Sequence, residues 1–409
     1  MRRTPVRPAL VGLVAVLVVL IPMSMSAEPL SGLAPRELSD RRSSEVEALN
    51  TDAESSGVTS DQLAWQNEFS ELVTSYSMDA ERKYSYSEIV APRDAVLAFG
   101  EVAPADLQKR LTMLGGRVKV VEHTGFTELE IEAAASRAAQ VIIEHGATSA
   151  VAVPDARDRT ITLSYSGVTQ DSTELQRAQS AIENEVLGDE LENAGFLLQF
   201  KHSGTEVFEA DNFDGGWGLV YGGNVVCTMS FPVRRNSSTA LGLLTAGHCP
   251  GTGTYGGVSN AFFPPQDGSL WTTTAHPGGD FRWNWSKRFL TGWTYMGQGT
   301  RKFSRSANLP YGSNVCKYGH TTQYGCSLVL YKGMTGAVRP HPYNEIMAIG
   351  PLDGTPVNTN SGDSGGPYFS ASYAVGIYSG RAFSNGQAYA SAYSRVPNAL
   401  SRMNLSLVY

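Results

Sequence analysis

The composition of the chain changes abruptly near residues 203–215, and this change limits the folds that the chain can adopt. Residues 28–210 carry 32 acidic and 15 basic side chains, a net charge of 15 − 32 = −17. Residues 211–409 carry 7 acidic and 14 basic side chains, a net charge of 14 − 7 = +7, together with all four cysteines and 30 of the 42 glycines. A chain of 409 residues is long enough for two domains. We therefore predict an acidic domain at 28–211 and a basic domain at 212–409.

Residues 1–27 have the pattern of a secretory signal peptide. Three arginines at the start precede an apolar run at 9–21, and small residues follow at 24–27. The apolar run is too short to cross a bilayer well, and no stop-transfer pattern follows it. We therefore expect a secreted, extracellular protein that is monomeric and free of the membrane once the signal peptide is removed.

The acidic domain begins with a polar segment and then contains clear helix signals. Residues 28–60 are charged and aperiodic, so we predict that they are mobile. The letters TELE at 127–130 form a capping box, with Thr127 as the N-cap and Glu130 bonding back to it. The alanine-rich helix that follows should end near Gly146.

Extended segments alternate with these helices, which predicts an α+β fold for residues 61–211. Residues 149–153 and 160–166 are strand-like and predict a hairpin. A second helix is expected over 171–188, and the letters FLLQFK at 196–201 predict a further strand.

The basic domain consists of short β-rich runs separated by Gly, Asn, Ser and Pro. Long amphipathic helical stretches are missing before the last dozen residues, where a helix is one alternative. This pattern is typical of an all-β sandwich or closed barrel. Its lysines and arginines are scattered and no nucleic-acid motif accompanies them, so we expect no nucleic-acid partner.

The letters NTNSGDSGGPYFS at 358–370 predict a rigid turn that presents a serine nucleophile. A neutral serine needs a base, a group that orients this base, and donors that stabilise an oxyanion. Ser364 would be the nucleophile, and the N–H groups of Gly362 and Ser364 would form the oxyanion hole. Glycines at 362, 365 and 366 allow backbone angles and close approaches that side chains would prevent. The alternative is an ordinary Gly/Ser-rich surface turn.

The candidate base and the candidate orienting acid lie upstream of this serine. His248 follows a buried strand in the letters LLTAGHC at 243–249, and Asp280 follows a Gly-Gly turn in HPGGDFRWN. Asp267 and Asp353 are the other acids considered for the orienting role. The order His248, Asp280, Ser364 is the chymotrypsin order.

The motifs TAGHC and GDSGGP resemble the chymotrypsin-like serine proteases. The loop CKYGHTTQYGC at 316–326, the strand GIYSG at 376–380 and the large region ahead of the catalytic domain are similar to the bacterial branch of streptogrisins and α-lytic-protease-like enzymes. The resemblance covers nearly all of residues 212–409 and is looser over 127–201. It implies two six-stranded antiparallel β-barrels, a protein or peptide substrate and no cofactor.

The resemblance also implies roles for residues around the triad. Ser379 would assist Asp280, and the backbone of Ser379, Gly380 and Arg381 would pair with the substrate as an added β-strand. Asp363 would be buried and would brace the oxyanion turn. The bacterial branch typically neutralises this acid with an arginine after the first cysteine of the short loop, where this chain has Lys317.

Four cysteines in a secreted chain predict two disulfides, for which three pairings are possible. We favour Cys227–Cys249, next to the histidine, and Cys316–Cys326 across the short loop. A cysteine that relatives carry just before the GDSGGP run is absent here, where Thr359, Asn360 and Ser361 stand. With no acid at Asn358, we expect large apolar or aromatic residues before the cleaved bond.

No metal site is expected, because His276, His320 and His341 lack zinc-type spacing with other ligands. The acidic domain could be a binding domain that stays attached, or a pro-region that assists folding and blocks the active site. Its position, its opposite charge and FLLQFK, which could pair with an edge of the catalytic domain, favour the pro-region. For the whole chain, the alternatives are a catalytically inactive relative that acts as a secreted binding protein and a β-rich adhesion or carbohydrate-binding protein.

Overall fold

The computed structural model describes residues 35–168, 173–205, 207–209, 218–221, 224–238, 240–249, 262–263, 279–286, 292–296, 300–338 and 347–408. The chain divides into a unit at Met1–Arg42 and a unit at Ser43–Tyr409, and the second is described here. The predicted signal peptide lies outside the described residues. No helix in the described ranges combines the length and the apolar character needed to cross a membrane.

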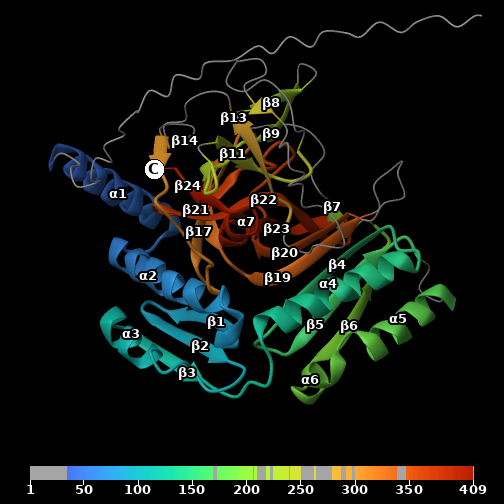
Figure 1. Cartoon of the computed structure of the whole chain (residues 1–409). Coiled ribbons are helices and arrows are strands. Elements are labelled where there is room, and N and C mark those ends of the chain that lie inside the picture. Colours follow the sequence, from blue (N-terminus) through green and yellow to red (C-terminus); the bar gives the residue numbers. More distant parts are fainter. Residues whose placement is uncertain are drawn as a thin grey trace, which may run out of the picture. The chain divides into compact units, whose positions relative to one another are not determined.

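The segment that the sequence predicted to be mobile contains a helix. Helix α1 spans Pro35–Ser56, and α2 follows at Ser60–Ser77 with a capping box between Thr59 and Gln62 (Figure 1). The polar sequence of α1 shows no periodicity of its own, but its Ala48, Asp52 and Ala53 are buried in the unit from Ser43 onward. This segment is therefore helical because it packs against the rest of the protein, and the periodicity of the sequence gives no sign of such packing.

A first α+β layer follows α2. It contains strands and helices listed here with their bounds: η1 (Ala80–Arg82), β1 (Tyr84–Ala91), β2 (Asp94–Phe99), α3 (Leu107–Leu114) and β3 (Arg117–Val121). The strands form a sheet in the order β1-β2-β3. Trp65, Phe69 and Tyr76 of α2 pack on Leu97 and Phe99 of this sheet, forming a core of its own.

The second α+β layer agrees with the predicted helices and hairpin. Its elements are α4 (Glu128–Glu144), β4 (Ser149–Asp155), β5 (Thr160–Ser166), α5 (Thr173–Glu185), α6 (Gly188–Asn193) and β6 (Leu197–His202). Thr127 caps α4, and its capping box with Glu130 is complete, as predicted. β4 and β5 form the predicted antiparallel hairpin. The α+β character of the acidic domain is thus confirmed.

The prediction that FLLQFK pairs with the catalytic domain was wrong. This segment forms β6, which pairs in parallel with β5. In this layer the strand that pairs with the basic domain is β4, whose other edge pairs antiparallel with β19 (Tyr331–Val338). Ala337 of β19 packs into the core beneath α4. Both edges of β4 are therefore used, one by each domain, and one continuous sheet runs through the two (Figure 1).

The basic domain is β-rich and mostly antiparallel, as predicted. Its strands before Ser364 are β8 (Gly218–Tyr221), β9 (Asn224–Thr228), β10 (Pro232–Arg235), β11 (Leu241–Thr245), β12 (Phe262–Phe263), β13 (Arg282–Ser286), β14 (Trp293–Tyr295), β15 (Thr300–Lys302), β16 (Arg305–Ser306), β17 (Asn314–Gly319), β18 (Gln323–Leu328), β19 and β20 (Met347–Thr355). The remaining elements are β21 (Pro367–Ser370), β22 (Tyr373–Ser384), β23 (Gln387–Arg395), α7 (Val396–Arg402) and β24 (Leu405–Leu407).

Most strands of this domain belong to two sheets. The first sheet has the order β12-β13-β11-β10-β24, and the second contains β18-β17-β21-β22-β23-β20-β19. Phe231, Leu244, Phe281 and Trp283 are buried in a core that also receives residues of β21 and β22. This arrangement agrees with the predicted chymotrypsin-like fold class.

A buried cluster of charges joins α4 to the basic domain. Glu128 and Glu132 of α4 meet Arg395, with its Nη1 3.3 Å from Glu128 Oε2 and its Nη2 2.8 Å from Glu132 Oε1. Lys332 Nζ lies 3.0 Å from Glu128, and Asp353 accepts hydrogen bonds from Arg395. Three carboxylates therefore share two cations. Burial raises the pKa of Glu132 from its ordinary 4.5 to about 7; the positive charge of Arg395 opposes this rise, and the negative charge of Glu128 adds to it.

This pKa predicts a pH dependence of stability. The folded chain holds the Glu132 proton more tightly than the unfolded chain, so the stabilisation is complete below about pH 4.5 and is lost as the pH rises through about 7. Glu132→Gln keeps the shape but cannot ionise. We expect the unfolding free energy of this variant, measured by urea denaturation, to decrease less than that of the wild type between about pH 4.5 and about pH 7. Glu144→Gln, on the exposed side of the same helix, should leave the fall unchanged, and equal curves for the two variants would contradict the assignment.

Candidate active site

His248 and Asp280 are brought together by the pairing of β11 with β13. The register sets Thr245, at the end of β11, opposite Arg282, at the start of β13. His248, which follows β11, and Asp280, which precedes β13, therefore lie at the same end of the sheet. Asp280 Oδ2 lies 2.6 Å from His248 Nδ1, and its Oδ1 accepts a 2.9 Å hydrogen bond from the backbone N–H of His248.

Ser364 approaches the same histidine from the turn before β21. His248 Nε2 lies 3.0 Å from Ser364 Oγ, so the three residues form a continuous chain of hydrogen bonds. Asp280 and Ser364 are fully buried, and the His248 side chain is 9% exposed. The structure thus brings together the three residues that the sequence singled out.

This geometry suits proton transfer away from a hydroxyl. The buried Asp280 carboxylate accepts from Nδ1 and so places the neutral imidazole's proton there, which leaves the lone pair of Nε2 facing Ser364 Oγ. The same carboxylate would stabilise the imidazolium once the proton has moved. The arrangement can therefore generate an alkoxide-like nucleophile without a metal.

The turn that carries Ser364 is held by close backbone approaches. Thr228 of β9 donates from its N–H to the carbonyl of Ser364 and from Oγ1 to the carbonyl of Gly362. Gly365 has a φ of +82°, and a Cβ there would lie 2.1 Å from Thr245 Oγ1. Only glycine fits this position. In the described part of the chain, no acceptor is paired with the N–H of Gly362 or of Ser364, which leaves both donors available.

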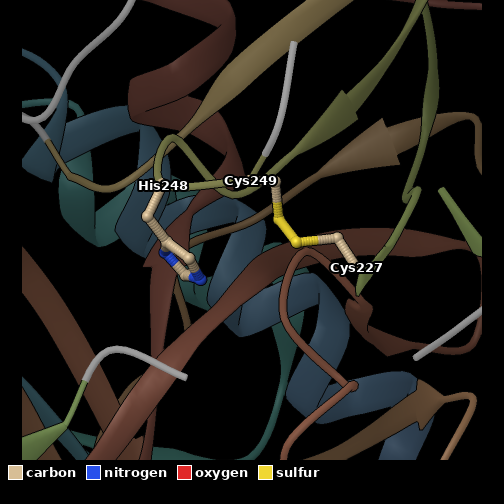
Figure 2. A group of neighbouring side chains, drawn as sticks. All are labelled: Cys227, His248 and Cys249. Carbon is tan, nitrogen blue, oxygen red and sulfur yellow. A yellow bond between two sulfur atoms is a disulfide. The ribbon is translucent and has the colours of Figure 1, made fainter. Parts of the chain in front are cut away.

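The disulfide Cys227–Cys249 links the two halves of this arrangement. Cys249 follows His248, and Cys227 precedes Thr228, which holds the Ser364 turn. Figure 2 shows the imidazole beside this disulfide. One atom each of Cys227, His248 and Cys249 lie within 4.8 Å of one another, as in a metal site. Sulfurs joined in a disulfide have no thiolate to offer a metal, so this group is not a metal centre.

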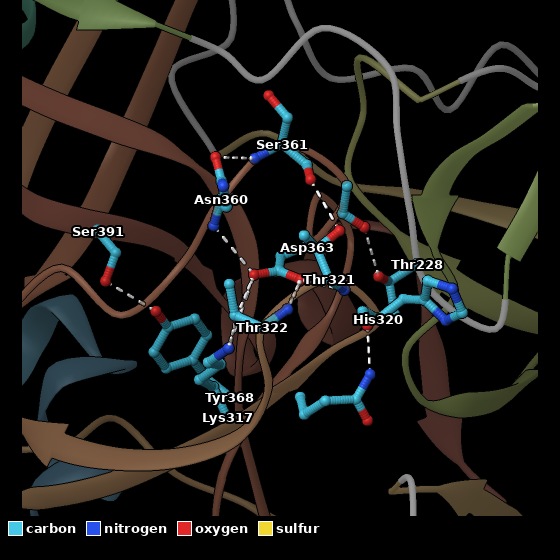
Figure 3. Close-up of polar contacts among 12 residues, drawn as sticks. Thr228, Lys317, His320, Thr321, Thr322, Asn360, Ser361, Asp363, Tyr368 and Ser391 are labelled. Carbon is cyan, nitrogen blue, oxygen red and sulfur yellow. Dashed lines mark hydrogen bonds and ion pairs between the residues drawn. The ribbon is translucent and has the colours of Figure 1, made fainter.

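Asp363 is buried beneath the same turn and accepts several hydrogen bonds (Figure 3). The N–H groups of Thr321 and Thr322 donate to Oδ1 at 3.0 and 3.2 Å, and the N–H of Asn360 donates to Oδ2 at 3.1 Å. The Thr322 hydroxyl also donates to Oδ2. Most of the stabilisation of this carboxylate therefore comes from the tip of the β17–β18 hairpin and its own turn.

Lys317 supplies the positive charge beside Asp363. Its Nζ lies 3.6 Å from Asp363 Oδ2 and donates to the Thr322 hydroxyl. The side chain is 3% exposed, and burial lowers the pKa of Lys317 while the negative charge of Asp363 opposes this. The second disulfide, Cys316–Cys326, closes the hairpin that presents Lys317 and the two threonines.

The residues expected to contact substrate lie on β22. Ser379 Oγ lies 3.0 Å from Ser394 Oγ, and Ser394 Oγ accepts from the N–H of Asp280 at 2.7 Å. Ser379 therefore reaches Asp280 through Ser394. Gly380 and Arg381 pair with β23 on one side, and Arg381 lies opposite Glu209 of β7 (Phe208–Glu209) on the other.

Sequence reasoning missed the residues that support the site. Thr228, Ser394, Asn360 and the pair Thr321–Thr322 carry hydroxyl or amide groups of a kind found throughout the chain. The two threonines had a signal, since they lie inside the short cysteine loop, and Asn360 lies just before the GDSGGP run. Thr228 and Ser394 become visible only when the sheets bring distant strands together.

The sequence of the chain is similar to those of several known proteins. The family model described as Trypsin matches residues 285–403. Streptogrisin-C of Streptomyces griseus is 32% identical over 171 residues, which cover 41% of this chain and 34% of that protein, so the chain spans only about a third of this relative. Glutamyl endopeptidase 2 of the same organism is 28% identical over 205 residues, covering 47% of this chain and 98% of that protein. The crystal structure of Nocardiopsis protease (NAPase) is 26% identical, with a TM-score of 0.36 over 48% of this chain and 100% of its own.

The packing around Asp363 gives a direct prediction. A Cβ on Gly319 would lie 2.2 Å from Asp363 Oδ1, and this carboxylate is fixed by its donors. We expect Gly319→Ala to lower the unfolding free energy by about 1–3 kcal/mol, measured by urea denaturation. Gly204→Ala, where a Cβ meets nothing within 4 Å, is the matched control. Equal stability of the two variants would show that Asp363 is free to move.

Proposed function

We propose that the chain, whose sequence is similar to those of bacterial chymotrypsin-like serine proteases, is a secreted serine endopeptidase made as a self-processed preproenzyme. The observation that carries this proposal is the hydrogen-bonded chain from Ser364 Oγ through His248 to the buried Asp280. The substrate is a protein or peptide, and no cofactor takes part in the steps below.

The reaction proceeds through an acyl-enzyme. Ser364 Oγ attacks the carbonyl carbon of the cleaved bond while His248 Nε2 takes the hydroxyl proton. His248 then gives this proton to the leaving amine, and the C–N bond breaks. Water enters, loses a proton to His248 and releases the carboxyl product, with Ser364 regaining its proton. Asp280 keeps the imidazole oriented and balances its positive charge in both halves.

The oxyanion of each tetrahedral intermediate is stabilised by the N–H groups of Gly362 and Ser364. The hydrogen bonds from Thr228 and the network around Asp363 support this role, because they fix the backbone on both sides of the turn. Lys317 lowers the cost of burying the Asp363 charge. Asp363 and Lys317 are thus positioning residues.

The substrate binds as a β-strand along Ser379, Gly380 and Arg381. In the intact chain, β7 occupies the edge of β22, with Glu209 opposite Arg381 and the carbonyl of Val207 accepting from the N–H of Phe383. Residues 28–211 are therefore a pro-region that takes the place of substrate. The fully buried Ser364 is in keeping with this role.

The proposed cut lies between Asp211 and Asn212, two residues beyond the last residue of β7 in the sequence. Cleavage there separates the pro-region from the catalytic domain at 212–409. Asn358 favours a large apolar or aromatic residue before the cut in other substrates. The acidic Asp211 and the similarity to a relative named glutamyl endopeptidase 2 favour an acidic one. Cleavage of a peptide library decides between the two preferences.

The alternative is an inactive homologue that serves as a secreted binding protein. Such proteins would not need the nucleophile, base and orienting acid to remain in hydrogen-bonding contact. The distances of 3.0 and 2.6 Å between these groups therefore favour the enzyme.

Replacement of the nucleophile tests the activity and the processing together. We expect Ser364→Ala to lower kcat by roughly a millionfold and to leave the chain uncut. Wild-type protein should yield a product whose amino-terminal sequence begins at Asn212, and the variant should not. An uncut wild-type chain, or a variant cut at the same bond, would contradict self-processing.

A second prediction concerns folding assistance by residues 28–211. The catalytic domain is rich in long-range strand pairs, which slow folding, and β4 supplies a partner for the β19–β20 hairpin. We expect residues 212–409 alone to regain activity slowly after denaturation and to refold faster when the pro-region is added. Activity that returns promptly to its full value without the pro-region would exclude this role.

A further inference from the structure

A fully buried carboxylate of α1, that of Asp52, accepts hydrogen bonds from residues of the basic domain. Arg301 Nη1 lies 2.9 and 2.7 Å from the two oxygens of Asp52. The Tyr324 hydroxyl donates to Oδ1 at 2.7 Å, and the N–H of Ala371 donates to Oδ2 at 2.6 Å. Asp52 is 0% exposed, although its helix is strongly polar. Burying an unpaired carboxylate is costly, so these three donors determine where this helix can dock.

The donors are held by contacts within the basic domain itself. The Arg301 guanidinium lies 4.7 Å from the centre of the Phe369 ring and also donates to the carbonyl of Ala371. The Tyr324 hydroxyl lies 3.5 Å from the sulfurs of both Cys316 and Cys326. None of these contacts involves the acidic domain. The donors are therefore positioned by contacts that do not involve α1, which reduces the entropic cost of binding a carboxylate.

The chemistry of the donors fits an anion. Arg301 carries a permanent charge, and burial together with the negative charge of Asp52 raises the pKa of Tyr324, so the phenol stays protonated and donates. Phe369 and the disulfide form an apolar wall in which such hydrogen bonds are strong.

We propose that Arg301, Tyr324 and the N–H of Ala371 form a carboxylate-binding exosite on the catalytic domain, whose ligand is Asp52. The exosite uses none of the triad or substrate-strand residues. It holds α1 on the catalytic domain independently of β7, so the pro-region stays bound after the bond between Asp211 and Asn212 is cut. This consequence rests on the proposed function, whereas the exosite itself does not.

The exosite also contacts the hairpin that braces the nucleophile. Tyr324 and Cys326 lie on β18, and the tip of the same hairpin carries Thr321 and Thr322, which hold Asp363. Asp52 therefore contacts β18 at Tyr324, two residues from Thr322, which holds Asp363.

Hydrogen exchange tests the exosite in a chain that needs no catalysis. In full-length protein carrying Ser364→Ala, we expect Asp52→Asn to raise the exchange rate over residues 43–56 by at least about tenfold. Glu54→Gln makes the same charge change on an exposed position of the same helix and should have no effect. Equal exchange in the two variants would overturn the proposal.

A double-mutant cycle separates docking from an effect on the helix alone. Tyr324→Phe removes one donor but keeps the ring, and it should also raise exchange over 43–56. If both residues act through one contact, the exchange rate of the double variant should be only slightly higher than that of the faster single variant. An unchanged exchange rate in Tyr324→Phe, or fully additive effects, would show that Asp52 serves only its own helix.

The self-processing chain tests the consequence for release. After processing, we expect the cut pro-region to co-elute with the catalytic domain in size-exclusion chromatography. In Asp52→Asn we expect it to dissociate at least about tenfold faster, while Glu54→Gln behaves as wild type. Equal dissociation in the two variants would overturn the role of the exosite in retention. An uncut wild-type chain would instead count against the proposed function and leave the exchange result standing.

Discussion

The pairing of the buried Asp280 carboxylate with His248 is the interaction on which the proposed active site depends. It is fully buried and accepts hydrogen bonds from both the backbone N–H and the side chain of His248. A charge in this position is tolerable only while both donors are present. The need to satisfy it therefore fixes the histidine turn, the imidazole orientation and the end of the β11–β13 pair together. Ser394, which accepts from the N–H of Asp280, extends this constraint to β23 and Ser379.

Ser364, the proposed nucleophile, is placed by a second set of contacts, which is linked to the first by a disulfide. Thr228 holds the Ser364 turn, and its neighbour Cys227 is bonded to Cys249, the neighbour of His248. Movement of the serine turn relative to the histidine is thereby limited on both sides. The Asp363 network secures the same turn from below through the β17–β18 hairpin.

Much of the site could be predicted because its residues lie in short motifs with special backbone needs. The glycines around Ser364 and the cysteine beside His248 point to a constrained turn from the letters alone. The capping box at Thr127 and the hairpin after it were predictable for the same reason, since local chemistry decides them. Helix α1 was not predictable, because the burial of Asp52 depends on residues far away in the sequence. The pairing of β4 with β19 was not predictable for the same reason. Thr228 and Ser394 escaped prediction for that reason too.

Covalent labelling of Ser364 by an organophosphonate tests the central claim most directly, since this reaction needs an activated serine. In processed wild-type protein we predict a single adduct on Ser364, located by peptide mass spectrometry. Labelling should be strongly reduced in a His248→Ala variant that retains its fold. Absence of an adduct in folded wild-type protein, or equal labelling without His248, would contradict a serine nucleophile activated through His248 and Asp280.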